Sequence, residues 1–390
     1  MKQGADGRSD WRLRERRQPL SGTSRHCVTT MMWLATAAGL VCSCSPESQS
    51  FKENASAPAP PVNERRISPK ALKRSETVSR WRIVGDSTSY WVSTTLREVG
   101  QFVVVGDQRT TPHLSVIDTR NWQITARVGD HGSGAGQMMD ANSVGEVVGD
   151  TMAVWAFDTR LHRFTEVSID ATGQARINRQ VVLPVAMHPQ TLQVAHQVGG
   201  VFTSGWYGDA VLYRIDSTHN TRSTIAVALP YDSTVAARVS TRQELNMRSL
   251  AVAPRSGRMV LAYQYASRLD FFGPKGEYEL TVTGPRMPRV HFDLVTPTAP
   301  FKWFDDTELA YVAVAATERF VYALYCGCTK KSRAFAPYVE VFTWDGAFVR
   351  ELVLDVPIFR LAALSGDTLV LGATWDPYPS IGVWKIPKPE

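Results

Sequence analysis

The sequence predicts an all-β protein, a six-bladed β-propeller of four-stranded antiparallel blades, closed by an N-terminal strand that completes the last blade. Two observations lead to this prediction. From Trp81 onward, short β-rich runs alternate with turn signals about every 8–12 residues, and no segment of useful length has a helical period. In addition, parts of the chain align with one another, as repeated units do.

The stretch Gly129–Gly173 reads as one blade. A glycine-rich loop comes first, and an Asp-x-x-Gly turn ends the stretch. Three β-rich runs lie between them, Ser143–Val148, Met152–Phe157 and His162–Ile169. Asp and Gly suit such turns because Asp bonds the backbone locally and Gly adopts left-handed conformations. The stretch therefore defines the unit to look for elsewhere.

The unit recurs along the chain. Leu250–Tyr263 aligns without gaps on Val312–Tyr325, and Gly149–Trp155 matches Gly366–Gly372. Third strands of a blade are expected at six places, Leu114–Ile117, His162–Ile169, Val211–Ile215, Arg268–Phe272, Tyr338–Phe342 and Ile381–Ile386. Turn residues follow the first five of them, and the sixth lies at the end of the sequence. Six third strands indicate six blades.

Closure of the ring follows from the same count. The last blade has only three strands before the sequence ends, and Arg80–Val84 is free to serve as its fourth. Such pairing joins the two ends of the ring and protects strand edges that would otherwise be exposed. The long stretches 228–247 and 284–308 have room for further strands, so the number of blades could differ from six by one.

Residues 1–44 read as a signal peptide. Val28–Val41 is an apolar run of about fourteen residues, which suits a signal sequence and is too short to span a bilayer as a helix. The Cys42-Ser43-Cys44 segment resembles a bacterial lipobox, and Cys44 fits the lipidated position better because small Ser43 precedes it. The residue after the cysteine is Ser45 rather than Asp, so the lipobox resemblance implies the outer rather than the inner membrane. An ordinary cleaved signal and an uncleaved anchor remain alternatives.

The rest of the chain divides into a tether and a domain. Residues 45–78 are rich in Ser, Pro, Ala and charges and predict a flexible tether. The propeller is expected over 79–390. Of the net charge of +6, residues 1–43 carry +4, from seven basic against three acidic residues, which leaves about +2 for the remainder. This near-neutral body argues against a nucleic-acid partner.

The loop Gly132–Gln137 adds a family resemblance. It stands where NHL and TolB-like propellers carry a Gly-x-Gly-Pro-Gly-Glu or Gly-Gln-Phe element, with departures at Ala135 and Met138. Together with the lipobox, the chain resembles a bacterial six-bladed propeller lipoprotein over 80–387. The resemblance implies a cell-envelope protein of the outer membrane, periplasmic or surface-exposed. The loop does not predict a nucleotide site, because no Lys-Ser/Thr pair or helix follows it.

Propeller ligands usually bind at the channel mouth, on loops that connect one blade to the next. Polar and aromatic candidates on these loops are Asp140, Asn142, His188, Asn246, Arg248, Arg289, His291, Trp303, Asp305, Asp306 and Arg360. Asp140, Asn142, Asn246, Asp305 and Asp306 could supply oxygen ligands to an ion like that of a calcium-dependent lactonase. Each residue taken singly is more often a solvated loop residue than a ligand. Trp206, Trp303 and Trp375 lie near loops, where one could stack on a sugar or peptide.

Cys326 and Cys328 form the only cysteine pair of the expected domain. In an oxidising compartment they could form a local disulfide, since Gly327 can supply the bend. Free thiols and a redox or metal role are the alternatives. A structural zinc site would lack ligands, because no second cysteine pair or His-x-x-His motif accompanies them.

These observations favour a non-catalytic binding module, anchored to the membrane by a lipid, with a protein, peptide or glycan partner and no cofactor. No Gly-x-Ser-x-Gly or His-Glu-x-x-His signature is present to indicate an enzyme. A metal-dependent hydrolase or lyase at the channel mouth is one alternative hypothesis. A structural scaffold in an envelope complex is another.

Overall fold

The computed structural model of the protein divides the chain into two units, 1–56 and 57–390. The structure describes parts of the second unit only, namely residues 63–85, 93–146, 152–183, 191–197, 200–205, 210–216, 222–227, 244–293, 302–332, 337–364, 366–376 and 378–388. The candidate residues Cys44 and His188, and also Trp206, lie outside the described residues.

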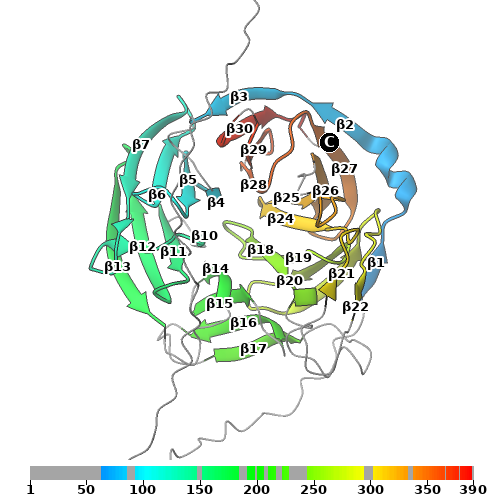
Figure 1. The fold of residues 1–390 in the computed structure, drawn as a ribbon, viewed down its shortest axis with the longest axis horizontal. Coiled ribbons are helices and arrows are strands. Elements are labelled where there is room, and N and C mark those ends of the chain that lie inside the picture. Colours follow the sequence, from blue (N-terminus) through cyan, green and yellow to red (C-terminus); the bar gives the residue numbers. More distant parts are fainter. Residues whose placement is uncertain are drawn as a thin grey trace, which may run out of the picture. The chain divides into compact units, whose positions relative to one another are not determined.

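Six four-stranded antiparallel blades follow one another around a ring, as the sequence predicts (Figure 1). Blades 1 to 3 consist of β4 (Ser93–Val99), β5 (Phe102–Asp107), β6 (Leu114–Asp118) and β7 (Gln123–Val128); β10 (Ser143–Glu146), β11 (Ala153–Asp158), β12 (Arg163–Ile169) and β13 (Ala175–Val182); and β14 (Thr191–Gln197), β15 (Gly200–Gly205), β16 (Ala210–Asp216) and β17 (Arg222–Val227). Blades 4 to 6 consist of β18 (Arg248–Val252), β19 (Met259–Tyr263), β20 (Arg268–Phe272) and β21 (Tyr278–Thr283); β24 (Tyr311–Ala316), β25 (Phe320–Tyr325), β26 (Tyr338–Thr343) and β27 (Phe348–Leu354); and β28 (Arg360–Ala363), β29 (Leu369–Thr374) and β30 (Ser380–Lys385), with β3 (Arg80–Val84) as the fourth strand. All six expected third strands occupy the third position of their blades.

The inner strands β4, β10, β14, β18, β24 and β28 contact one another in chain order, and β28 returns to β4. Middle strands such as β5 are buried along their whole length because a blade packs on each face. This double burial explains why the middle strands read as continuous apolar runs in the sequence.

Ring closure depends on β3. This strand pairs with β30 in antiparallel fashion, with Ile83 opposite Gly382 and Val84 opposite Ile381. Trp384 on β30, opposite Arg80, is fully buried and donates from its indole Nε1 to the Asp355 carboxylate at 2.8 Å. The predicted closure by the N-terminal strand is therefore confirmed.

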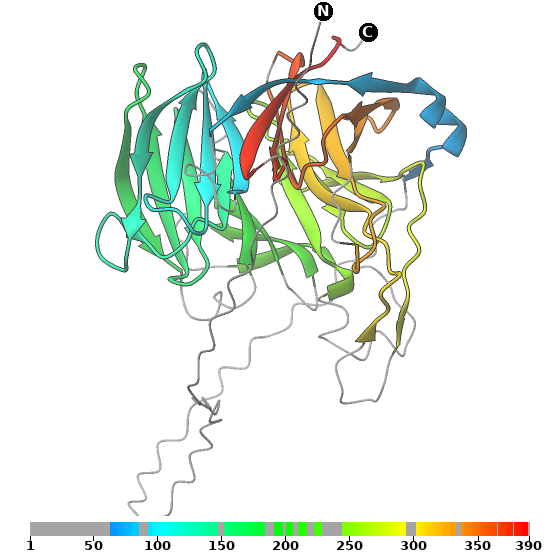
Figure 2. The same ribbon diagram turned by 45° about the horizontal axis from the view of Figure 1, so that its top comes forward.

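The segment just before β3 differs from the expected tether. Residues 63–78 include β1 (Glu64–Arg66), the 3₁₀ helix η1 (Pro69–Arg74) and β2 (Ser75–Val78). β1 adds in parallel to β21 and β2 adds in parallel to β27, so blades 4 and 5 have five strands (Figures 1 and 2). We call residues 63–84 the N-terminal strap. The outer strands offer free backbone groups, and an extended chain can pair with these groups whatever side chains it carries. The polar composition of residues 63–78 therefore did not reveal β1 and β2.

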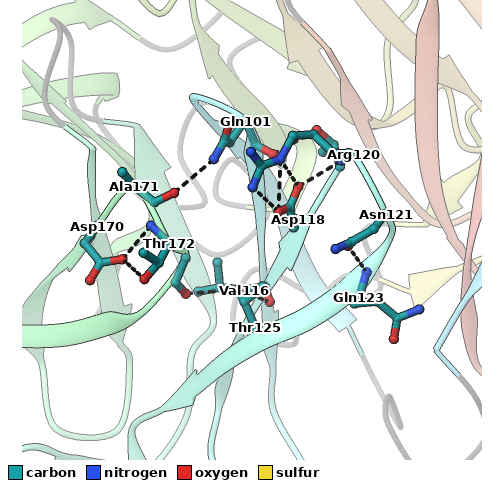
Figure 3. A network of polar contacts seen from close by, with 12 residues as sticks. Gln101, Val116, Asp118, Arg120, Asn121, Gln123, Thr125, Asp170, Ala171 and Thr172 are labelled. Carbon is teal, nitrogen blue, oxygen red and sulfur yellow. Dashed lines mark hydrogen bonds and ion pairs between the residues drawn. The ribbon is translucent and has the colours of Figure 1, made fainter.

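The Asp-x-x-Gly turn after β12 fastens blade 2 to blade 1 (Figure 3). The Asp170 carboxylate accepts hydrogen bonds from the backbone N of Thr172 at 2.8 Å and from its hydroxyl at 2.6 Å. Gly173 has a φ of +86°, and a Cβ there would lie 2.5 Å from the Thr125 hydroxyl of blade 1. The Thr125 hydroxyl instead donates to the Gly173 carbonyl at 2.9 Å. The turn residues predicted from sequence thus also serve as contacts between blades.

Two of the loops that connect blades contain a short pair of strands, the loop before blade 2 and the loop between blades 4 and 5. β8 (Asp130–His131) and β9 (Gln137–Met138) pair within the loop before blade 2. β22 (Phe292–Asp293) and β23 (Lys302–Trp303) form a hairpin between blades 4 and 5, which projects beyond the ring in Figure 2. The described part of 284–308 therefore adds no blade. Among the described residues, no helix has the length and apolarity needed to cross a bilayer.

A buried ionic cluster lies within blade 5 and against blade 4. Glu340 on β26 is fully buried opposite Glu351 on β27. Arg286 pairs with both carboxylates, at 2.8 Å to Glu340, and the Tyr311 hydroxyl donates to Glu340 at 2.7 Å. Desolvation raises the pKa of Glu340 to about 7, and the neighbouring Arg286 and Tyr311 oppose that rise.

We expect Glu340 to make stability fall as the pH rises. Its folded-state pKa lies above its unfolded value, so folding favours the protonated form, and stability is lost between about pH 5 and about pH 7. The free-energy difference between wild type and Glu340→Gln should change across this range by at most roughly 3 kcal/mol. Urea unfolding at several pH values measures it, with the exposed Glu277→Gln as control. A difference that is independent of pH would contradict the expectation.

Candidate functional site

The channel opens into a cavity of about 390 Å³ at the end where the inner strands begin. Every one of the six inner strands contributes to its wall. The polar side chains that line it are Thr95, Arg97, Asn142, Ser143, Gln193, Arg248, Ser249, Gln264 and Arg360. Among the described lining residues none is Asp, Glu or His. The candidate site is therefore a polar and cationic channel mouth.

Three guanidinium groups reach the cavity from three blades. Arg97 lies on β4 of blade 1, Arg248 begins β18 of blade 4, and Arg360 begins β28 of blade 6. Each donates to backbone carbonyls. Arg97 Nη1 donates to Leu96 at 2.9 Å, Arg248 Nη2 to Gly205 at 2.9 Å, and Arg360 Nη1 to Phe359 at 2.8 Å. These carbonyls help to orient the planar guanidinium groups.

Burial and a like charge act on Arg360. The surrounding protein desolvates this guanidinium and lowers its pKa, and the positive charge of Arg97 lowers that pKa further. Arg97 also lines a narrower cavity beside it, together with Glu98 and small side chains of β24 and β28. Arg97 thus lines both cavities.

Amide side chains complete the wall. Gln193 Oε1 accepts from the backbone N of Leu250 at 2.5 Å, which links β14 of blade 3 to β18 of blade 4. Asn142 Oδ1 accepts from Gln108 Nε2 at 3.2 Å. Such neutral groups can hydrogen-bond a ligand without adding charge.

The structure places the predicted site residues in two different environments. Asn142, Arg248 and Arg360 line the cavity. Asn246 is buried next to it, and its carbonyl accepts from Arg248. Asp140 is buried away from the lining residues, where its carboxylate accepts from the backbone N of Thr159 at 3.0 Å and from its hydroxyl at 2.7 Å.

The remaining predicted residues belong to the insertion that carries the β22–β23 hairpin. Asp306 pairs with Arg289 at 3.6 Å and with His291 Nδ1 at 3.3 Å, and Asp305 lies 3.8 Å from Lys331. Trp303 stacks on the Tyr265 ring, with centroids 4.3 Å apart. None of the predicted residues of this insertion is among the residues that line the cavity.

A metal centre finds little support in this geometry. Of the five residues expected to offer oxygen ligands, only Asn142 lines the cavity. In the part of the chain that the structure describes, no group of three or more His, Cys, Asp or Glu side chains is placed to hold a metal ion.

Sequence reasoning missed Arg97, Gln193 and Gln264. Arg97 and Gln193 lie within inner strands rather than on connecting loops, and Gln264 directly follows β19. A signal was present for the first of them. Arg97 is a charged residue within Ser93–Val99, the first strand of the first complete blade. A charge at a position that is otherwise usually apolar indicates that the side chain faces the channel.

The glycine loop before blade 2 is occupied by the protein's own side chains. Gln137 Oε1 accepts from the backbone N of Gly134 at 2.9 Å, and Gln180 Oε1 accepts from that of Gly136 at 2.9 Å. Arg163 donates to the Ser133 carbonyl at 3.1 Å. The contacts of Gln137 and Gln180 use backbone amides that a phosphate would need.

Cys326 and Cys328 are joined by a disulfide, with their Cα atoms 5.0 Å apart. Gly327 between them has a φ of +61°. The segment pairs with the chain before β24, since Cys326 N donates to the Ala310 carbonyl at 2.7 Å and Leu309 N donates to the Cys328 carbonyl at 2.9 Å. Because Leu309 lines the cavity, the disulfide segment is hydrogen-bonded to a residue of the cavity wall.

Comparisons with known proteins bear on the fold. No protein-family model matches the chain, and no curated protein matches it. The chain is similar to the solved structure of a DUF4221 family member from Bacteroides vulgatus, with 10% identity, a TM-score of 0.50, and coverage of 79% of this chain and 96% of that one. A provisionally named exported protein from Bacteroides fragilis has 9% identity and a TM-score of 0.47, covering 80% and 98%. The β-propeller domain of Cps50 (Swd1) from Myceliophteria thermophila has 10% identity and a TM-score of 0.45, covering 79% and 99%. At these identities the likeness concerns the fold alone.

We expect the cysteine pair to resist alkylation in the folded protein unless a reductant is present. Trypsin should release both cysteines in the single peptide Phe320–Lys330. Without reductant, mass spectrometry should find this peptide unalkylated and two hydrogens lighter than the dithiol. With reductant it should carry two alkyl groups. Double alkylation without reductant would contradict the disulfide.

Proposed function

We propose that this chain is a lipid-anchored propeller of the cell envelope, of the TolB-like or NHL-like kind, and that it works as a non-catalytic binding module. Its ligand binds at the channel mouth. The observation that carries the proposal is the cavity of about 390 Å³ that all six inner strands line, five of them with arginine, amide or hydroxyl groups. Small-ligand sites typically have volumes of about 300–1,000 Å³ and a few convergent polar groups.

The chemistry of the wall supports binding rather than catalysis. The lining hydroxyls of Thr95, Ser143 and Ser249 have no histidine or carboxylate beside them among the described lining residues. A hydrolytic serine or threonine needs such a base. The metal-dependent hydrolase hypothesis would need several ligands at the mouth, where only Asn142 of the expected set is present.

An aromatic rim supports a protein, peptide or glycan partner. Trp375 is 55% exposed, and its ring meets that of Phe359 edge-to-face at 6.0 Å. Since Phe359 lines the cavity, Trp375 extends the site outward from the mouth. Exposed aromatic rings of this kind stack on sugars and on peptide side chains.

Filling the mouth should abolish ligand binding. Gln264→Trp adds a bulky ring where a half-buried side chain lines the cavity, and the backbone bonds of residue 264 to Met247 and Ala310 are retained. Peptide and glycan arrays probed with the full chain should lose their signals for this variant. Gln123→Trp, at an exposed position on the outer strand β7, is the matched control. Signals that survive in Gln264→Trp with an unchanged thermal midpoint would contradict a site at the mouth.

The anchor is tested separately. Cys44 follows the apolar run and small Ser43, as a lipidated cysteine should. In a bacterial host fed a fatty-acid analogue, wild type should be labelled and Cys44→Ala should not. Labelling that persists in this variant moves the site to Cys42, and a lack of label in wild type refutes lipidation.

A further inference from the structure

We propose that the joint between blades 1 and 6 carries a second binding site, and that this site takes an acidic oligosaccharide. A sugar ring of the ligand packs against the exposed indole of Trp81, and carboxylates of the sugar meet Lys385 and Arg82. The site is separate from the channel mouth and does not depend on the proposed function.

The first observation is a crevice of about 440 Å³ that spans the joint. Blade 1 lines it with Trp122 among others, and blade 6 lines it with Trp81, Leu369 and Lys385. Leu369 begins β29 and Lys385 ends β30, so the crevice lies at the end of the blades away from the mouth. A second crevice of about 400 Å³ shares Trp122 as part of its wall. Both volumes lie within the range of small-ligand sites, and together they give room for more than one sugar ring.

The second observation is the position of Trp81 in the closing strand β3. The register against β30 shifts between Arg80 and Arg82, so Trp81 between them lies at a β-bulge. Bulges redirect side chains at the edges of sheets. The indole is 44% exposed, and it meets the ring of buried Trp122 edge-to-face at 6.1 Å. Trp122 thus holds in place an exposed aromatic surface against which a sugar ring can pack.

The third observation is the charge around this indole. Lys385 Nζ lies 3.9 Å from the centroid of the Trp81 ring, and Arg82 Cζ lies 5.3 Å from it. In the described part of the chain, neither of these side chains forms an ion pair with a carboxylate. Arg120, in contrast, pairs with Asp118 at 2.6 Å (Figure 3). No acidic residue is among the described residues that line the two crevices. Complementary charge therefore favours an acidic sugar over a neutral one.

The remaining wall offers hydroxyl groups. Thr119 and Thr368 line the crevice on its two sides, one from blade 1 and one from blade 6. The Thr119 hydroxyl already donates to the Gln101 carbonyl at 2.8 Å, so its oxygen is left to accept from a hydroxyl of the ligand. An aromatic face, hydroxyl groups and two cations at one crevice match a sugar that carries carboxylates.

Calorimetric titration of the full chain with tetragalacturonate tests the proposal. Maltotetraose is the neutral probe, and hexaglutamate is the probe for an acidic peptide. We expect tetragalacturonate to bind most tightly of the three, with an affinity that falls as salt is added, because exposed charges are screened.

Substitutions at the crevice should weaken this binding. Trp81→Ala should weaken it at least about tenfold, because the packing surface for the sugar ring is lost. Lys385→Gln should weaken it roughly twofold to fivefold, as expected for an exposed ion pair. The matched controls are Phe304→Ala, which removes an exposed ring of the insertion between blades 4 and 5, and Lys275→Gln in an exposed turn of blade 4. Both controls should keep the affinity of wild type.

Thermal unfolding reports whether each variant folds. Without ligand, Trp81→Ala should unfold at a lower temperature than wild type, since its ring contact with Trp122 is lost. Trp81→Phe keeps an aromatic ring and should recover part of both the thermal midpoint and the affinity. Tetragalacturonate should raise the midpoint of wild type and of Lys275→Gln by more than that of Trp81→Ala, as linkage requires.

Four outcomes would overturn the proposal. They are no binding of tetragalacturonate to wild type, unchanged affinity in both Trp81→Ala and Lys385→Gln, binding of maltotetraose or hexaglutamate at least as tight as that of tetragalacturonate, and loss of tetragalacturonate binding in Gln264→Trp. The last outcome would assign the acidic sugar to the channel mouth. Binding that is retained in Gln264→Trp and weakened in Trp81→Ala supports a second site at the joint.

Discussion

Pairing between β3 and β30 is the interaction on which the rest of this propeller depends. Each blade buries both faces against neighbours, so the first and last blades need a joint as tight as the others. β3 provides it by completing blade 6 from the other end of the domain, beside fully buried Trp384. The joint also sets the channel, because inner strand β28 of blade 6 contacts β4 of blade 1. Arg360 and Arg97 belong to these two strands, so ring closure is what brings their like charges together.

The inner strands differ from the middle strands in the residues that they bury. The middle strands follow the usual rule that apolar side chains are buried, as β5 shows along its whole length. The inner strands depart from that rule at Arg97, Arg248 and Arg360, where charge is placed in a partly desolvated cavity. Residues that break a folding rule tend to mark functional sites.

Turn spacing and self-alignment predicted the fold because each blade repeats the same local physics. Third strands and their Asp- and Gly-containing turns could be read from residues close together in sequence, and the closing strand from the missing fourth strand of the last blade. The first two strands of the strap could not, since Glu64–Arg66 and Ser75–Val78 depend on free edges of strands more than 200 residues later. The site was only half predictable for a similar reason. Asn142, Arg248 and Arg360 were predicted as residues of the loops that connect blades. Arg97 shares a cavity with them only once the six blades have closed into a ring.

The path of the strap has a consequence for the order in which the chain can fold. Residues 63–84 pair with blades 4, 5 and 6, each of which is made after blades 1 to 3. In a chain synthesised from its N-terminus, β1 and β2 therefore stay unpaired until blades 4 and 5 are present, and β3 stays unpaired until blade 6 is present. Such long-range pairing slows folding and leaves strand edges open meanwhile. Arg97 of blade 1 and Arg360 of blade 6 line one cavity only after β3 has paired with β30 and closed the ring.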